Sequence, residues 1–376
     1  MTLFIFSLAV LSSFLLSSGA EEGFPPLPIL QTKGSHYQNG YSTGQLFQKQ
    51  ILAAMENNTF FNSRLLQYIT TDTGDSQFKG YLATAEEHYP QYVDEIRGMA
   101  SGANITFNKL FLWNMKFEFN LMLEPRLHAL PPPACSDLYL LGDSLDVMGH
   151  NEDGAAILVS TGYLLNVTTV TGGERFLAYC YPGELCGNAF GYNYATKTVV
   201  TCNALFPKII NTSAIGRNFL NRALLGQSYS EAVTTLKHIQ CSSGFSLNIG
   251  SSRKGVWSVS NFEVSSAGAV ETVYDNGYGF HFNSYLHSPD VAQYSDPSSH
   301  HRLTRIRSLP PATRAEDIVD YLGDTEDTQY PIYRTATPPD YGTTIATAVF
   351  DLGKSVMILY RGNPTLTKPV MTLPLD

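Results

Sequence analysis

The chain is poor in charge, and no stretch of it is dominated by one sign. Only 15% of its 376 residues are Asp, Glu, Lys or Arg, and the 33 acidic residues outnumber the 24 basic ones. Nucleic-acid binding depends on a clustered basic surface, so we expect no nucleic-acid partner. The hydrophobic content of 43% excludes a disordered chain and suffices for one large domain or two ordinary ones.

Several common catalytic and metal-binding motifs are also missing. There is no Cys-x-x-Cys pair and no set of cysteines and histidines with zinc spacing, so we expect neither a metal nor a cofactor. A Gly-x-Ser-x-Gly elbow, which marks many serine hydrolases, is absent as well. The residues around Cys135 lack the pattern of papain-like proteases. Mechanisms that depend on these motifs are therefore disfavoured.

Long hydrophobic runs are absent except near the start of the sequence. Residues 3–16 form an uncharged apolar stretch that is too short for a membrane span and typical of a signal peptide. We interpret residues 1–20 as that signal peptide, expect no membrane span after its removal, and predict a secreted or lysosomal protein. Four candidate glycosylation sites agree with this route: Asn57, Asn104, Asn166 and Asn211.

The chain has five cysteines, and an odd number means that at least one stays unpaired if the others form disulfides in an oxidising compartment. The four downstream cysteines can form two disulfides in three pairings, which would leave Cys135 free. The alternative is that Cys135 is itself bonded and another cysteine is the spare. The disulfide candidates under the first interpretation are Cys180, Cys186, Cys202 and Cys241.

The character of the chain changes at Cys135. Residues 21–134 show mostly helical patterning, including one long apolar helix expected at 107–123, and end in three prolines at 131–133. Short β-branched and aromatic runs follow, separated by Gly, Asn and Asp, with helices expected at 217–225, at 231–238 after Ser230, and from Thr313 onward. The pair His300-His301 reads as a solvated loop. This pattern predicts an α+β fold.

The position of Cys135 suggests a chemistry. It follows a proline-rich connector and opens an apolar strand-like run, so cleavage before it would create a new chain terminus. Its thiol would then be the nucleophile, and its freed α-amine, with an intrinsic pKa of roughly 7.7–8.0, would be the base.

Eight segments in order along the chain resemble one family of enzymes. They are 88–100, 134–136, 149–153, 217–225, 280–283, 321–324, 345–352 and 359–364. Together they resemble the acyl-coenzyme A:isopenicillin N acyltransferase family of N-terminal-nucleophile enzymes, and most of all its insect branch that acts on N-β-alanyl-dopamine and carcinine. The resemblance implies a four-layer αββα sandwich and self-cleavage between Ala134 and Cys135. The products would be a helical chain of residues 21–134 and a sheet-rich catalytic chain of residues 135–376.

The resemblance also implies roles for individual residues. Asp153 matches an acidic residue near the nucleophile, Asn283 matches an amide that serves the oxyanion hole, and Arg334 matches an arginine near the active site. Ala134 stands where the acyltransferases often have Gly, which adds one methyl group at the cleavage point.

Substrate contacts are predicted from charge and aromatic character alone. Glu152 has the charge to meet the ammonium of a β-alanyl group. Tyr181 and Tyr192 could line an aromatic pocket for the leaving amine, or could simply belong to the core.

The sequence therefore predicts a small-molecule amide hydrolase that works through a Cys135 acyl-enzyme, with N-β-alanyl amines as the best substrate guess. Two alternatives stay open. One is an acyltransferase that passes the acyl group to an amine, and the other is a secreted binding glycoprotein of the same fold without catalysis. The two chains of the precursor are the expected protein partners.

Overall fold

The computed structural model describes residues 24–124, 134–142 and 145–376. The predicted signal peptide and the prolines at 131–133 lie outside these residues. Within them the chain has a mixed α+β fold with two sheets, as predicted. None of the described helices is long and apolar enough to cross a membrane.

The first third of the chain is helical, as predicted, apart from strand β1 (Ile29–Gly34). The expected single helix at 107–123 is instead two helices that meet at Met115. Next to this point the Asn114 side chain donates to the carbonyls of Leu110 and Gly183. The helical elements are α1 (His36–Leu46), α2 (Gln48–Glu56), η1 (Phe61–Leu65), α3 (Leu66–Tyr68), α4 (Asp72–His88), α5 (Pro90–Ala103), α6 (Phe107–Asn114) and α7 (Lys116–Leu123).

Two sheets make up most of the remaining chain. The eight-stranded sheet has the order β1-β4-β5-β6-β7-β8-β9-β10, in which only the β1–β4 pair is parallel. Its later strands are β4 (Tyr163–Thr169), β5 (Arg175–Cys180), β6 (Phe190–Asn193), β7 (Thr198–Ala204), β8 (Phe245–Arg253), β9 (Val256–Ser265) and β10 (Gly268–Tyr274). The six-stranded sheet has the order β11-β2-β3-β12-β13-β14. Its strands are β2 (Ala134–Leu141), β3 (Val147–Gly154), β11 (Gly277–His281), β12 (Thr343–Asp351), β13 (Val356–Tyr360) and β14 (Met371–Pro374).

Among the described residues after Cys135, the helices are α8 (Leu158–Thr161), α9 (Arg217–Gly226), α10 (Tyr229–His238), α11 (Pro297–Ser308) and α12 (Ala315–Leu322). Helices α9, α10 and α12 lie where helices were predicted. The predicted cap of α10 was wrong, because Ser228 rather than Ser230 accepts the Glu231 N–H and completes a capping box. The predicted loop at His300-His301 was also wrong, since both histidines lie in α11.

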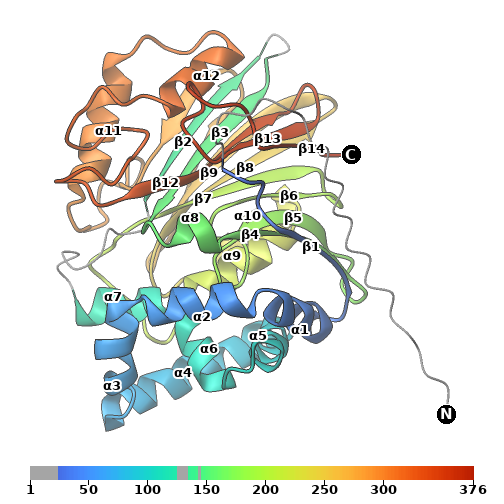
Figure 1. Cartoon of the computed structure of the whole chain (residues 1–376), viewed down its shortest axis with the longest axis vertical. Helices are drawn as coiled ribbons and strands as arrows, with labels where there is room; N and C mark the ends of the chain where they lie inside the picture. Colours follow the sequence, from blue (N-terminus) through green and yellow to red (C-terminus); the bar gives the residue numbers. More distant parts are fainter. Residues whose placement is uncertain (1–23, 125–133, 143–144) are drawn as a thin grey trace.

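Three apolar clusters lie on successive sides of the two sheets. One joins the N-terminal helices, α9 and α10 to the eight-stranded sheet, the second lies between the sheets, and the third joins the six-stranded sheet to α11 and α12. Figure 1 shows the same succession, with α1–α7 beneath the eight-stranded sheet and α11 and α12 at the opposite end.

Strand β2 is buried along its whole length, and its side chains alternate between two of these clusters. Tyr139 and Leu141 belong to the cluster between the sheets, whereas Leu138 and Leu140 belong to the cluster under α11 and α12. Because side chains alternate along a strand, Cys135 shares the face of Tyr139, between the sheets.

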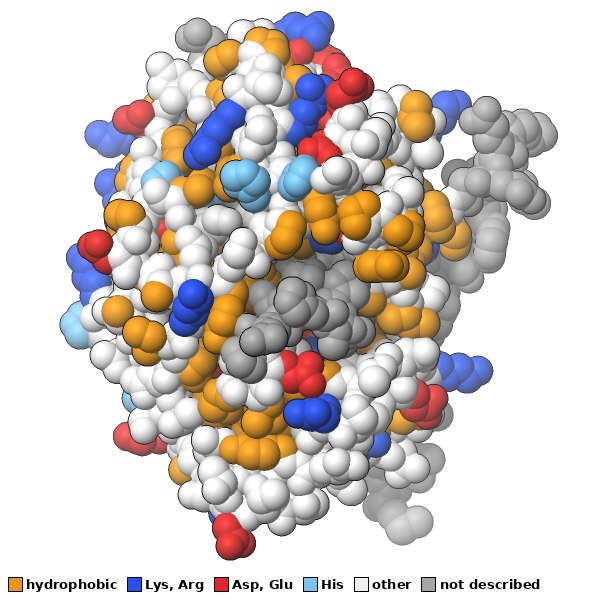
Figure 2. Space-filling view, turned by 90° about the vertical axis from the view of Figure 1, so that its left-hand side faces the viewer, with side chains coloured by type: hydrophobic (Ala, Val, Ile, Leu, Met, Phe, Trp, Pro, Cys, Tyr) orange, Lys and Arg blue, Asp and Glu red, His pale blue; other side chains and the backbone are white. Residues whose placement is uncertain are grey.

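Charge on one face of the molecule (Figure 2) is mixed rather than segregated. On the face shown in Figure 2, Lys and Arg side chains are interspersed with Asp and Glu. That face carries no single-sign expanse of the kind that binds a polyanion.

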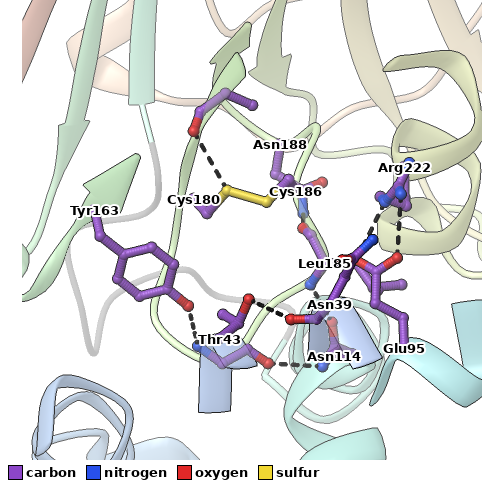
Figure 3. Close-up of a disulfide and its surroundings, with 12 residues drawn as sticks. Asn39, Thr43, Glu95, Asn114, Tyr163, Cys180, Leu185, Cys186, Asn188 and Arg222 are labelled. Carbon is purple, nitrogen blue, oxygen red and sulfur yellow. Dashed lines mark hydrogen bonds and ion pairs between the residues drawn. A yellow bond between two sulfur atoms is a disulfide. The ribbon is translucent and has the colours of Figure 1, made fainter. Parts of the chain in front are cut away.

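The loop after β5 is closed by the one disulfide among the described residues, between Cys180 and Cys186 (Figure 3). Asn114 bonds to the loop twice, at the Gly183 carbonyl and the Leu185 N–H. The expectation of two disulfides was wrong, because Cys202 and Cys241 are free and buried. Cys202 lies in β7, and its sulfur accepts a hydrogen bond from the Asn221 side chain. The backbone of Cys241 forms an isolated parallel β-bridge with that of Ile215.

A buried ion network ties the helical half to the sheet-rich half. The guanidinium of Arg222, in α9, is fully buried and donates to both oxygens of Glu95, in α5, at 3.2 and 3.1 Å. It also bonds to Glu174 at 2.7 Å, and His36 contacts Glu95 at 3.0 Å. Burial opposes ionisation of Glu95, but Arg222 and His36 outweigh it and lower the pKa of this carboxyl below its ordinary value.

This network predicts a large loss of stability on removing its cation. Arg222→Met leaves two carboxylates without their buried partner, so the free energy of unfolding should fall by about 3–5 kcal/mol. Urea unfolding in a Cys135→Ala background, where the thiol cannot react, measures the change. The matched control is Arg97→Met, which removes a half-buried surface arginine that also pairs with two carboxylates and should cost less than about 1 kcal/mol. Equal losses in the two variants would contradict this role of Arg222.

Candidate active site

The antiparallel register of β2 and β3 assembles the site. It pairs Cys135 with Glu152 and Ala134 with Asp153. Consecutive pairs point to opposite faces of a sheet. The thiol and Glu152 therefore lie between the two sheets, while the Asp153 side chain lies on the face toward α11 and α12.

On the inner face, four side chains form a hydrogen-bonded chain that begins at the thiol. Cys135 Sγ donates to Glu152 Oε1 at 3.4 Å. The other carboxylate oxygen of Glu152 lies 3.0 Å from His150 Nε2, and His150 Nδ1 lies 2.9 Å from Asp137 Oδ1. Tyr181 also donates its hydroxyl to Glu152 Oε1. Because Tyr181 starts the disulfide-closed loop, that loop fixes the position of its hydroxyl.

The electrostatics of this face keep the thiol protonated in the intact chain. Burial and the neighbouring Glu152 raise the pKa of Cys135 well above its ordinary value. Burial also raises the pKa of Glu152, although His150 opposes the shift. Burial disfavours a charged imidazole, yet Asp137 and the other partners of His150 raise its pKa well above the usual value.

The same face contains the atoms of a possible three-ligand metal site. One ligand atom each from Cys135, His150 and Glu152 lie within 4.8 Å of one another. Hydrogen bonds among these atoms, and to Asp137 and Tyr181, already satisfy them without an ion.

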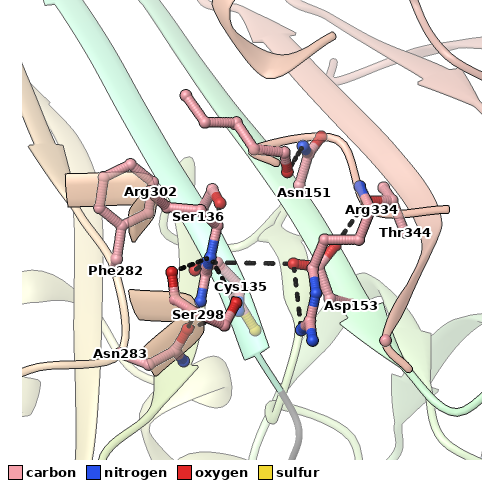
Figure 4. A network of polar contacts seen from close by, with 12 residues as sticks. Cys135, Ser136, Asn151, Asp153, Phe282, Asn283, Ser298, Arg302, Arg334 and Thr344 are labelled. Carbon is pink, nitrogen blue, oxygen red and sulfur yellow. Dashed lines mark hydrogen bonds and ion pairs between the residues drawn. The ribbon is translucent and has the colours of Figure 1, made fainter. Parts of the chain in front are cut away.

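On the outer face, Asp153 lies between two arginines (Figure 4). Its Oδ2 is 4.0 Å from Arg302 and 3.9 Å from Arg334, and its Oδ1 accepts the Thr344 hydroxyl at 2.7 Å. Arg334 is held in turn by Asp340, whose Oδ2 lies 2.8 Å from Nε. Burial raises the pKa of Asp153 to about 6, against the opposing attraction of the two arginines.

Arg302 holds the Cys135 backbone from this face. It is fully buried in α11 and donates to the Cys135 carbonyl at 2.7 Å and to Ser136 Oγ at 3.0 Å. Its Nη2 donates to Asn283 Oδ1 at 2.7 Å, and the Cys135 N–H donates to the same oxygen at 2.9 Å. Both the amide nitrogen and the carbonyl of Cys135 are therefore fixed.

The orientation of the Asn283 side chain follows from its partners. Two donors converge on Oδ1, while Nδ2 donates to the Ala204 carbonyl at 2.9 Å. In this structure Asn283 thus presents its oxygen to the Cys135 nitrogen. Its amide N–H, which we expected to face an oxyanion, is bonded to a strand carbonyl.

Most of the predicted site residues do come together. Cys135, Glu152 and Tyr181 meet on the inner face. Asn283 contacts the Cys135 nitrogen, and Arg334 lies beside Asp153 on the outer face. Tyr192 does not join them: it packs in the cluster between the sheets and contacts Tyr194 edge to face.

The sequence analysis missed Arg302 and the pair His150 and Asp137. Asp296-Pro297, a side-chain cap followed by proline at the first helical position, was the available signal for the helix that carries Arg302.

Comparisons with known proteins indicate the kind of enzyme to which the chain is similar. Residues 140–366 match the sequence model of the family described as acyl-coenzyme A:6-aminopenicillanic acid acyl-transferase. The chain is also 25% identical over 375 residues to the β-alanyl-dopamine/carcinine hydrolase of Drosophila melanogaster, covering 93% of this chain and 96% of that protein. Together they indicate an enzyme of the amide hydrolase or acyltransferase type.

The raised pKa of Asp153 predicts a pH dependence of stability. Folding shifts the pKa of this group from 3.8 to about 6. Its stabilising contribution is therefore complete below about pH 3.8 and is lost as the pH rises through about 6. Between about pH 4 and about pH 7, the free energy of unfolding of the protein with Asp153 should fall by roughly 3 kcal/mol relative to that of the Asp153→Asn variant. Urea unfolding in a Cys135→Ala background measures the difference, and parallel pH profiles for the two proteins would refute it.

Proposed function

Because the chain belongs to the acyl-coenzyme A:6-aminopenicillanic acid acyl-transferase family, we propose that it is an amide hydrolase that cleaves itself before Cys135 and then acts through that residue. In this proposal the helix, sheet, sheet, helix succession is the αββα sandwich of N-terminal-nucleophile enzymes. Residues 21–134 become the helical chain and residues 135–376 the catalytic chain. The observation that carries the proposal is the double fixation of Cys135, through Asn283 at its nitrogen and Arg302 at its carbonyl.

Self-cleavage proceeds by an N-to-S acyl shift. Cys135 Sγ attacks the Ala134 carbonyl carbon, the bond from that carbon to the Cys135 nitrogen breaks, and a thioester forms. Water then hydrolyses the thioester, which leaves a carboxylate on Ala134 and restores the thiol. The thiol proton ends on the Cys135 nitrogen, which becomes a free α-amine.

The freed amine is the base of the mature enzyme. Its intrinsic pKa of roughly 7.7–8.0 lets it accept the thiol proton near neutral pH. Asn283 Oδ1 holds this nitrogen beside the thiol. The thiolate attacks the substrate amide, the amine returns the proton to the leaving group, and water hydrolyses the acyl-enzyme. For Asn283 to serve the oxyanion as well, its Nδ2 must exchange the Ala204 carbonyl for the substrate oxygen.

The two chains stay together after cleavage. Buried bonds between the halves, including Arg222 to Glu95 and the Arg217 N–H to Glu118, do not involve the cleaved junction. Separating the halves would also expose the apolar cluster that joins the N-terminal helices to the eight-stranded sheet, which is costly.

N-β-alanyl amines are the substrates we propose. The Drosophila relative is named for β-alanyl-dopamine and carcinine. Glu152 is fully buried, and its Oε1 lies 3.4 Å from Sγ. Its carboxylate is therefore close to the position that an acyl group bound to the thiol would take. An ammonium at the end of that acyl group would be its charge complement.

We also propose passage through the secretory pathway, with residues 1–20 as the signal peptide. The Cys180–Cys186 disulfide supports an oxidising compartment. Of the candidate glycosylation sites, Asn57 and Asn104 are exposed, Asn211 is half-buried, and Asn166 lies within β4 between two strands.

Intact mass after deglycosylation and reduction tests self-cleavage. The wild-type protein should give two fragments that cover residues 21–134 and 135–376, and Cys135→Ala should give one chain because it lacks the nucleophile. A single chain in both samples would overturn the proposal and favour a binding glycoprotein of the same fold.

Matched substrates test the proposed specificity. N-β-alanyl-dopamine and N-propanoyl-dopamine differ in the terminal ammonium. A charge-assisted bond worth about 1.5–3 kcal/mol predicts that kcat/KM favours the β-alanyl compound roughly 10- to 150-fold. Equal values would contradict an ammonium subsite. An added amine that appears as its β-alanyl amide would identify acyl transfer in place of hydrolysis.

A further inference from the structure

Self-cleavage of the intact chain needs a base for the Cys135 thiol, and the free α-amine that serves the cleaved enzyme does not yet exist. Before cleavage the Cys135 nitrogen is an amide and cannot accept the thiol proton. Burial and Glu152 also hold the pKa of that thiol high, so almost none of it ionises unaided. Some other group must take the proton while the first acyl shift occurs.

Glu152 is placed to do this. It is the residue opposite Cys135 in the β2–β3 register, and its Oε1 accepts the hydrogen bond from Sγ at 3.4 Å. The carboxylate is fully buried, so bulk water does not compete for the contact. Asp153, the other acid at the junction, has its side chain on the opposite face, beside Arg302 and Arg334.

Two neighbours fix the Glu152 carboxylate. His150 bonds to Oε2 and is itself oriented by Asp137, while Tyr181 donates to Oε1. Burial raises the pKa of Glu152 above its ordinary value, which brings it closer to the pH at which a carboxylate is an effective base.

We propose that Glu152, positioned by His150 and Tyr181, is the catalytic base for self-cleavage, and that the α-amine replaces it once that cleavage has occurred. This inference rests on the self-cleavage proposed above. The site would thus use two bases in succession on one thiol, and Glu152 would then be free to face the ammonium of the substrate.

The proton balance is closed within the chain. Glu152 Oε1 takes the proton from Sγ as the bond from sulfur to the Ala134 carbonyl carbon forms. When the bond to the Cys135 nitrogen breaks, that proton ends on the nitrogen and Glu152 is again a carboxylate. Hydrolysis of the thioester consumes one water.

The test compares Glu152→Gln with Glu118→Gln. Glu118 is an equally buried carboxylate in α7, and burial also raises its pKa, but it bonds to Arg217 and Ser243 rather than to the thiol. The full chains are synthesised in a cell-free system, quenched at intervals, and the fraction still intact is measured by mass. Glu152→Gln should slow self-cleavage at least about 100-fold, the lower end of general-base contributions. Glu118→Gln should cleave at the wild-type rate.

The pH dependence of the self-cleavage rate distinguishes a catalytic base at Glu152 from a purely structural role of this residue. The wild-type rate of self-cleavage should fall as the pH drops through the raised pKa of Glu152, and Glu152→Gln should lack this decline. A folded Glu152→Gln that cleaves at the wild-type rate, or an equal loss in Glu118→Gln, would overturn the inference. If Glu152→Gln does not fold, Glu152→Asp decides: it should cleave more slowly than Glu118→Asp, and equal rates would overturn the inference. A wild-type chain that never splits would instead refute the self-cleavage itself.

Discussion

The rest of the site depends on the antiparallel register of β2 and β3. A shift of one residue would turn every side chain of β2 to the other face, placing the Cys135 thiol under α11 and Asp137 away from His150. Apolar packing on both faces prevents this shift. Tyr139 and Met148 fill the cluster between the sheets, while Leu138 and Val147 fill the cluster under α11 and α12. The register is thus specified by hydrophobic burial, and the chemistry follows from it.

The strand backbone also separates two sets of charges. Carboxylates and a histidine gather on the inner face, where the thiol proton must go. Two arginines and Asp153 gather on the outer face, where Arg302 holds the Cys135 carbonyl. Buried charges are costly unless each has partners, and here each set contains both signs. In the mechanism proposed above, the separation lets the Cys135 side chain be deprotonated while the amide nitrogen and the carbonyl of Cys135 are held still.

Different parts of this account were accessible from the sequence to different degrees. The α+β class and the helical first third followed from periodicity, and Cys135 followed from its junction and the odd cysteine count. Asp153, Asn283 and Arg334 came from resemblance alone, because their meeting depends on strands and loops that are distant in sequence. Arg302 was missed, since Asp296-Pro297 signals a helix there but nothing local shows that an arginine within that helix is buried. The Cys135–Glu152 pairing needed the strand register, which local patterns do not specify.

The central claim is that one residue carries both a thiol and a free α-amine. Purified protein, denatured and reduced, can be treated with a cyanobenzothiazole reagent, which condenses with a 1,2-aminothiol and leaves internal cysteines without a stable adduct. Peptide mapping should find the label on a peptide that begins at Cys135. Alkylation of all five cysteines by an ordinary thiol reagent, with no cyanobenzothiazole adduct at Cys135, would contradict the account.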